Sequence, residues 1–385
     1  MPASPCKLLV FSDVHIHEFR EFATFEGGVN SRLSESLASV GWVAEQVRAA
    51  RKQARDQGPP GLVSENEVDC VFLGDLFHMK RQVSTQALQG AIEAFRHFPV
   101  APLLIPGNHD ILDMEGNWHL LSPFDRVISK CSSVMMLGST VQLHVVPYRR
   151  EATELRKLVA ECARSAREQD CFNLLALHCV LNEAVAGEGN RSLPASVELS
   201  DAELDPFDLV LVGDVHKRQQ HGKILYVGAL LSHNFGDAGD ADRGLTVLEF
   251  HTGAKPRIVA SLVSNPYNPR FLKYRIDSQD DISATAEEVT DLLETVPKPH
   301  IYIDLRVASR ELEGEVRGWA ENVEELGVRV RWSVEPQAIA ARASTVNMSM
   351  RPDAVVEHWA RTKSEQPELL LDVGRSILEE AIGGS

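Results

Sequence analysis

Five apolar segments of this chain lead directly into side chains that can bind a metal ion. Carboxylate, imidazole and amide groups recur in this position, although more than a hundred residues separate some of them. Oxygen and nitrogen donors of these types make up two-metal hydrolytic centres. The residues concerned are Asp13 and His15, Asp75, Asn108 with His109, His178, and Asp214 with His216.

The central segment is Leu104-Ile105-Pro106, which stops at Gly107-Asn108-His109-Asp110. An apolar run closed by Pro and Gly predicts a buried strand that ends in a tight turn. The turn would place Asn108 and His109 at the carboxyl end of the strand, where open α/β sheets bind ligands. The other four segments have the same form, so we expect their ligands along one edge of a sheet.

Each motif alone is a weak signal. A turn residue, a helix N-cap or a hydrogen-bonded histidine is the ordinary explanation for an Asp-x-His triplet or for a Gly-Asp pair after a strand. The fixed order of five such motifs, each at an expected strand end, favours one shared site instead.

In this order the motifs resemble those of the calcineurin-like metallophosphoesterases, over residues 7 to about 250. Within that family the chain is most similar to the SbcD (Mre-like) branch, the nuclease subunits of ATPase–nuclease complexes that repair DNA double-strand breaks. The similarity to this branch rests on Gly-Asp-Leu-Phe-His at 74–78, on the segments 206–219 and 226–229, and on the additional carboxyl-terminal segment.

The resemblance implies two divalent metal ions bridged by Asp75. Manganese is the usual activator in this family, and mixed imidazole and carboxylate ligands suit manganese, iron or zinc better than magnesium. The resemblance assigns one metal to Asp13, His15 and His216, and the other to Asn108, His178 and Asp214.

The resemblance also implies catalytic roles for His109 and His78. His109 follows a metal-binding Asn by one residue, so we expect it to point away from the metals and to stabilise the transition state or protonate the leaving alkoxide. His78 matches a family histidine that steers the phosphate, although a structural role is the alternative. The family usually has His where this chain has Asp214, which adds negative charge and would alter the metal preference.

The composition is that of an ordinary soluble globular protein, with 44% hydrophobic and 24% charged residues. The formal net charge of −16 argues against a broad basic surface for nucleic acid. If DNA is the substrate, metals, a partner or local basic clusters must supply the positive charge that contacts its phosphates. The pairs Arg149-Arg150 and Lys217-Arg218 could do so, and exposed charge without a function is the alternative.

We see no apolar run of the ~20 residues needed to span a membrane and expect a cytoplasmic protein.

Apolar periodicity predicts an α/β fold: a two-sheet metallophosphoesterase sandwich flanked by helices, a small α/β capping domain and carboxyl-terminal helices. Helices are expected at 33–55, 84–98 and 151–169, and strand–helix–strand units imply parallel pairing. We expect a metallophosphoesterase (nuclease) domain at 1–265, a capping domain at 270–335 and two partner-binding helices within 350–382.

The leading hypothesis is therefore a manganese-dependent DNA exonuclease or endonuclease. By resemblance, its carboxyl-terminal helices would bind an SMC-like ATPase, and a homodimer remains open. One alternative is a stand-alone phosphoesterase that acts on small nucleotides or phosphoproteins. Another is a metal-free scaffold, against which the complete ligand set argues.

Overall fold

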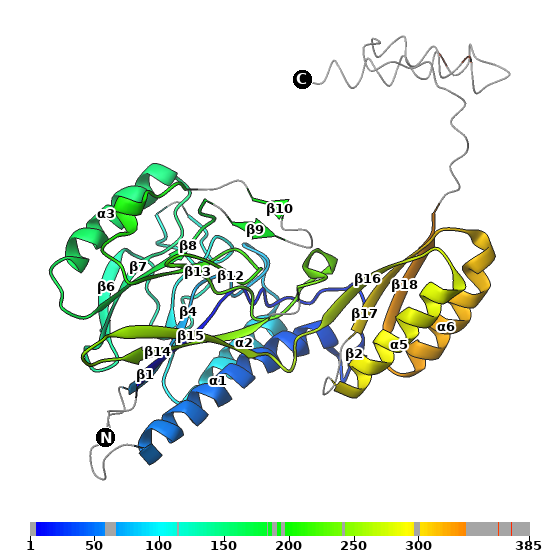
Figure 1. Ribbon diagram of the computed structural model, residues 1–385, viewed down its shortest axis with the longest axis horizontal. Coiled ribbons are helices and arrows are strands. Elements are labelled where there is room, and N and C mark those ends of the chain that lie inside the picture. Colours follow the sequence, from blue (N-terminus) through cyan, green and yellow to red (C-terminus); the bar gives the residue numbers. More distant parts are fainter. Residues whose placement is uncertain are drawn as a thin grey trace. The chain divides into compact units, whose positions relative to one another are not determined.

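The structure is a computed structural model that describes residues 5–57, 67–113, 115–182, 184–186, 191–193, 197–240, 243–295 and 301–335, with Arg361 and Leu371. Within these ranges the protein is mixed α/β, as its periodicity predicts (Figure 1). None of the described helices is long and apolar enough to cross a bilayer. The two helices expected within 350–382 lie outside the described residues, except for Arg361 and Leu371.

The first large sheet is mixed and has the order β15-β14-β1-β4-β5. Its parallel strands are β1 (Cys6–Phe11), β4 (Val68–Phe72) and β5 (Leu103–Leu104). The antiparallel strands β14 (Gly244–His251) and β15 (Arg257–Ser264) complete it on one side. Helices α1 (Ser31–Gln57) and α2 (Thr85–Arg96) connect the parallel strands, as expected for crossover connections.

The second large sheet has the order β12-β13-β11-β8-β7-β6. Its four central strands are parallel: β7 (Val141–Val146), β8 (Phe172–His178), β11 (Leu209–Gly213) and β13 (Ile224–Tyr226). The antiparallel edge strands are β6 (Ser132–Met136) and β12 (Gln219–His221). Helices α3 (Ala152–Ala166) and α4 (Asp201–Leu204) lie in its connections.

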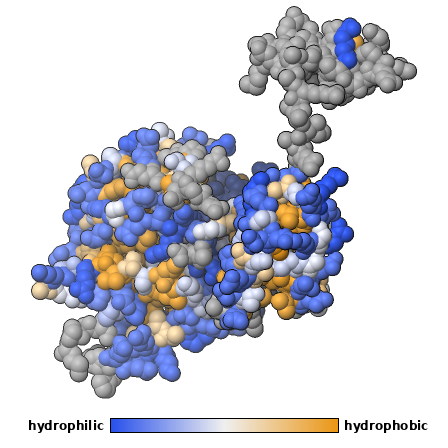
Figure 2. Space-filling model, turned by 45° about the vertical axis from the view of Figure 1, so that its right-hand side comes forward, coloured by the Kyte–Doolittle hydropathy of each residue, from blue (hydrophilic) through white to orange (hydrophobic). Residues whose placement is uncertain are grey.

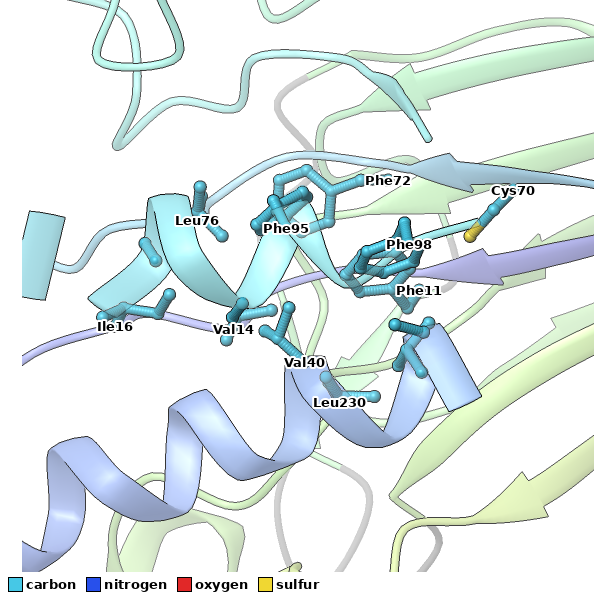
Figure 3. Close-up of a cluster of buried hydrophobic side chains, with 14 of the residues drawn as sticks. Phe11, Val14, Ile16, Val40, Cys70, Phe72, Leu76, Phe95, Phe98 and Leu230 are labelled. Atoms are coloured by element: carbon cyan, nitrogen blue, oxygen red, sulfur yellow. The ribbon is translucent and has the colours of Figure 1, made fainter. Parts of the chain in front are cut away.

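Apolar side chains of the two sheets meet in one buried cluster, which includes Leu8, Leu143, Leu211 and Leu248. A second cluster lies between the first sheet and helices α1 and α2, where Phe11, Phe72, Phe95 and Phe98 pack together (Figure 3). A third lies between the second sheet and α3. The parallel strands of each large sheet are therefore buried on both faces, which explains their near-continuous apolar runs.

The three-stranded sheet is parallel and consists of β16 (Arg270–Ile276), β17 (Ile301–Val307) and β18 (Arg329–Val334). Helices α5 (Gln279–Thr295) and α6 (Glu313–Glu325) pack beside each other against it and share its separate apolar cluster (Figure 1). The Tyr302 hydroxyl donates to a Glu35 carboxylate oxygen at 2.6 Å, which connects this sheet to α1. The expected division near residue 265 stays a prediction.

Some elements differ from the expectations. Strand β15 was not expected, because it is a largely exposed edge strand without clear alternation of apolar residues. After β13 the chain turns at Gly228, which has a positive φ of 77°. Two short antiparallel pairs lie outside the large sheets. They are β9 (Val185–Ala186) with β10 (Arg191–Ser192), and β2 (Phe25–Glu26) with β3 (Val29–Asn30).

On the face shown in Figure 2, hydrophilic residues predominate and hydrophobic residues lie in small groups. Individual exposed apolar residues, such as Trp118 at 73% exposure, are normal for a protein surface. The stability of the fold must therefore come from the buried clusters.

We predict that Val145→Ala destabilises the protein by roughly 1.5–3 kcal/mol, because two methyl groups are lost from the cluster between the sheets. Val145 is fully buried, whereas Val259 on β15 is 40% exposed. Val259→Ala is the matched control and should change stability by less than about 0.5 kcal/mol. Urea unfolding of both variants measures the difference, and equal effects would contradict this account of the core.

Candidate metal centre

The predicted metal ligands come from two sheets rather than from one sheet edge. Asp13 with His15, Asp75, and Asn108 follow β1, β4 and β5 of the first sheet, whereas His178 ends β8 and Asp214 with His216 follow β11 of the second. The sequence-based expectation of a single edge was wrong because apolar runs do not reveal which strands pair. In both sheets the ligand-bearing strands are parallel, so their carboxyl ends point the same way.

The backbone of the site is unusual. Four ligand candidates have left-handed φ angles: Asp13 (52°), His15 (46°), Asp75 (62°) and Asp214 (82°). Such angles are uncommon outside glycine and store strain, which is maintained where the surrounding structure fixes them. Here the chain leaves each strand abruptly, and hydrogen bonds between neighbouring segments hold the turns. The Asp13 amide donates to the Gly74 carbonyl at 2.9 Å, and the His15 amide to the Asp75 carbonyl at 3.0 Å.

Two glycines permit the close approach of these turns. A Cβ atom on Gly74 would lie 2.5 Å from His178 Nδ1 and 2.7 Å from the Cα atom of Gly107. A Cβ atom on Gly107 would lie 2.3 Å from Asp75 Oδ1. All three separations are shorter than van der Waals contact. A larger residue at Gly74 or Gly107 would therefore displace the ligands.

Asp75 lies at the centre of the site. Its Oδ1 is 3.3 Å from His178 Nε2, and its Oδ2 is 3.7 Å from His15 Nε2. The two oxygens of one buried carboxylate therefore face imidazoles from different sheets. This is the arrangement that a carboxylate bridging two cations requires.

One group of possible ligands is formed by Asp13, Asp75 and His178, whose candidate donor atoms lie within 4.8 Å of one another. His178 Nδ1 lies 2.6 Å from the Leu73 carbonyl and is the N–H donor to it, which leaves a lone pair on Nε2. His178 Nε2, Asp13 Oδ1 and Asn108 Oδ1 are buried without a hydrogen-bond partner. Buried polar atoms are normally paired, so these three donors fit a metal ion.

A second group is formed by His15, His216 and His233, also within 4.8 Å. His15 Nε2 and His216 Nε2 face each other at 3.2 Å. Asp237 Oδ1 lies 3.4 Å from His216 Nδ1, so the carboxylate can hold the proton on that nitrogen and leave Nε2 free as a ligand.

The electrostatics of the site also suit a cation. Burial raises the pKa of Asp13 to about 6. Burial alone would lower the pKa of His178, but the neighbouring carboxylates of Asp75 and Asp214 raise it well above its ordinary value. Burial, reinforced by His233 and His216, lowers the pKa of His15 and keeps its ring neutral. In the absence of a cation, the proton on His178 therefore balances part of the carboxylate charge, and a metal ion would have to replace that proton to bind Nε2.

His109 and His78 lie beside His15. The ring centroids of His109 and His15 are 4.9 Å apart, and those of His78 and His15 are 5.5 Å apart. His109 Nδ1 lies 2.5 Å from the His78 carbonyl, so this nitrogen carries the proton and Nε2 is free to exchange one. Both residues are only partly buried, which leaves them accessible to a substrate.

Asp214 faces the site. Its Oδ1 lies 3.9 Å from His178 Nε2, its amide donates to Asp13 Oδ2 at 3.2 Å, and its side chain is 21% exposed. Asp214 is therefore near enough to His178 for both to bind the same metal ion. Its side chain is more open to solvent than those of Asp13 and Asp75.

Sequence reasoning missed three residues of the site: His233, Asp237 and Asp110. His233 donates from Nε2 to the Asp13 carbonyl at 3.0 Å and follows no strand of the sheets, so no local pattern identifies it. Asp110 belongs to the Gly-Asn-His-Asp tetrad, but its role is structural. Its carboxylate accepts backbone N–H groups from Gly107 (3.0 Å), Asp75 (2.8 Å) and Leu76 (3.0 Å).

The basic pairs separate into buried and exposed members. Arg149 is buried and forms an ion pair with Glu154 at 3.2 Å, whereas Arg150 is exposed. Arg218 donates to the Thr246 hydroxyl. Arg150 is the most exposed of these three arginines and is therefore accessible to a ligand.

No family model matches this chain, and no curated protein matches it at a significant level.

We predict that Asp110→Asn destabilises the protein by about 1.5–3 kcal/mol, since an amide NH₂ group would face backbone N–H groups that now donate to a carboxylate. Urea unfolding in the presence of EDTA measures this effect without a metal contribution. Asp125→Asn is the control, because Asp125 is exposed. If both variants unfold alike, the Asp110 carboxylate does not hold the two turns together.

Proposed function

We propose that the protein is a binuclear metal-dependent phosphodiesterase with the metallophosphoesterase fold, and that it acts as a DNA nuclease of the SbcD type. The observation that carries the proposal is the position of Asp75, whose two carboxylate oxygens face His178 and His15 separately at 3.3 and 3.7 Å. One carboxylate shared by two ligand groups is the simplest way to hold two cations the ~3.5–4 Å apart that two-metal hydrolysis requires.

The residues present fit two metals. Asn108, His178 and Asp214 offer oxygen and nitrogen donors on one side, and His15 and His216 offer imidazoles on the other. Asp13 was expected with His15 and His216, and its carboxylate lies near both groups: 3.9 Å from His15 Nε2, and clustered with Asp75 and His178. When bound, two divalent cations lower the pKa of water and offset the charge that develops on the phosphate. The mixed donor set is compatible with manganese, our preferred metal.

The chain's own contribution to catalysis would come from His109 and His78. With its Nδ1–H held by the His78 carbonyl, the doubly protonated form of His109 would donate its Nε2 proton to the leaving alkoxide and return to the neutral imidazole. His78, whose ring lies 5.7 Å from that of His109, would orient the phosphate from the same side.

DNA as the substrate, and an SMC-like ATPase bound through residues 350–382, belong to the same proposal. They rest on the resemblance of motifs 74–78 and 206–219 to the SbcD branch. In this proposal the small three-stranded sheet of β16, β17 and β18 would be the counterpart of the capping domain of that branch.

The decisive experiment offers linear duplex DNA, single-stranded DNA and bis(p-nitrophenyl) phosphate to the protein with Mn²⁺, and with EDTA as the control. The proposal expects manganese-dependent hydrolysis of at least one DNA substrate and of the small diester. Cleavage of the small diester alone would remove DNA from the proposal and favour a stand-alone phosphoesterase. Failure to bind Mn²⁺ or to cleave any substrate would refute the whole proposal.

We predict that Asp75→Ala abolishes hydrolysis, because loss of the shared carboxylate removes a ligand from both metals. Metal analysis after equilibration with Mn²⁺ should show clearly reduced occupancy, while circular dichroism checks the fold. Asp125→Ala should retain full occupancy. Two metals bound to the Asp75 variant would show that Asp75 does not bridge them.

We predict that His109→Ala keeps both metals but lowers the rate of DNA cleavage by about 10²- to 10⁴-fold, as expected for loss of a general acid. The loss should be smaller for bis(p-nitrophenyl) phosphate, whose leaving group needs little protonation. His97→Ala, at an exposed histidine on the far end of α2, is the control. Wild-type cleavage of DNA by the His109 variant would exclude this role.

A further inference from the structure

A cavity beside the metal centre has a basic lining. It has a volume of about 590 Å³, and its wall includes Asn108, which is also a predicted metal ligand. Its other polar residues are Lys80, Arg81, Asp113, Tyr148 and Arg150. A group bound in this cavity would therefore lie next to a phosphate held at the metals.

The cavity is positive in a protein that is otherwise acidic. Lys80, Arg81 and Arg150 face it with the single carboxylate of Asp113. All three cations are exposed, and none forms a salt bridge with another residue in the described part of the chain. The cavity lining therefore has an excess of positive charge, whereas the whole chain has a formal net charge of −16.

The position of Arg150 is fixed by its neighbours. The Tyr148 amide donates to the Pro106 carbonyl at 3.4 Å, two residues before Asn108. The buried Arg149 holds the same segment through Glu154 and the Tyr148 carbonyl. The chain after β7 is thus anchored against the Asn108 turn, which places Tyr148 and Arg150 at the cavity.

Tyr148 lines the cavity and is close enough to interact electrostatically with both Asp214 and Arg150. Burial and the Asp214 carboxylate raise the pKa of its phenol, and Arg150 opposes this shift. The hydroxyl stays protonated near neutral pH and can donate a hydrogen bond to a phosphate oxygen.

We infer that this cavity is a subsite for the phosphate adjoining the scissile one in a polynucleotide, bound by Arg81, Arg150, Lys80 and Tyr148. A free phosphate monoester or small diester has no second phosphate and would not use it. The inference rests on the proposed function, and it assigns the selectivity for polynucleotides to these residues. Arginine suits this role because its guanidinium binds phosphate oxygens through two N–H groups.

The test compares the double variant Arg81→Ala/Arg150→Ala with wild type on a short single-stranded oligonucleotide and on bis(p-nitrophenyl) phosphate, both with Mn²⁺. For the oligonucleotide, kcat/KM should fall by about 10- to 100-fold, and its logarithmic salt dependence should weaken by about one to two units. For the small diester, kcat/KM should not change. Arg257→Ala, at an exposed arginine that begins β15, is the matched control and should affect neither substrate.

A binding measurement separates this inference from the proposed function. Fluorescence anisotropy with a labelled oligonucleotide in EDTA reports the subsite without hydrolysis, and the double variant should bind at least about tenfold more weakly than wild type. If wild type binds the oligonucleotide in this way but does not cleave it, the subsite stands and the nuclease assignment fails. Equal losses on both substrates, or no loss of oligonucleotide binding and cleavage, would overturn the subsite.

Discussion

The geometry of the site depends on one buried carboxylate that is not itself a ligand. Asp110 is fully buried, and it accepts backbone N–H groups from the turn that carries Asn108 and from the turn that carries Asp75. Burial and the neighbouring Asp75 carboxylate raise the pKa of Asp110 to about 7, and the backbone N–H donors oppose this shift, so they offset only part of its desolvation. Two strand ends of the first sheet are thereby locked to each other before any cation binds.

The second sheet packs against these two strand ends through close contacts that only glycine allows. His178 passes within the space that a side chain on Gly74 would occupy, and its Nδ1 hydrogen bond to Leu73 ties β8 to the end of β4. The left-handed backbone of Asp13, Asp75 and Asp214 is a consequence of the same crowding. Strain of this kind persists where it keeps donor atoms in place, so the protein is preorganised for a charged ligand.

The sequence predicts the parallel units and the five strand ends because buried parallel strands are apolar on both faces and stop at polar turns. It does not predict how the strands are divided between sheets, since pairing depends on contacts between distant residues. For the same reason the sequence did not reveal β15 or His233. β15 is a largely exposed edge strand without regular alternation, and His233 reaches the Asp13 carbonyl from a loop over two hundred residues away. Ligands that follow regular elements can be found from local patterns, whereas ligands and supports in loops cannot.

The acidic charge of the whole chain and a nucleic-acid substrate are compatible on physical grounds. At physiological salt the Debye length is about 8 Å, so dispersed surface carboxylates are largely screened at a bound phosphate. Charges within a few ångströms are screened much less, and at this cavity the three cations Lys80, Arg81 and Arg150 outnumber the single carboxylate of Asp113. Divalent cations bound at the neighbouring ligands would offset the buried carboxylates and extend the positive region to Asn108. Local charge, rather than the formal net charge, therefore decides which anions this site can bind.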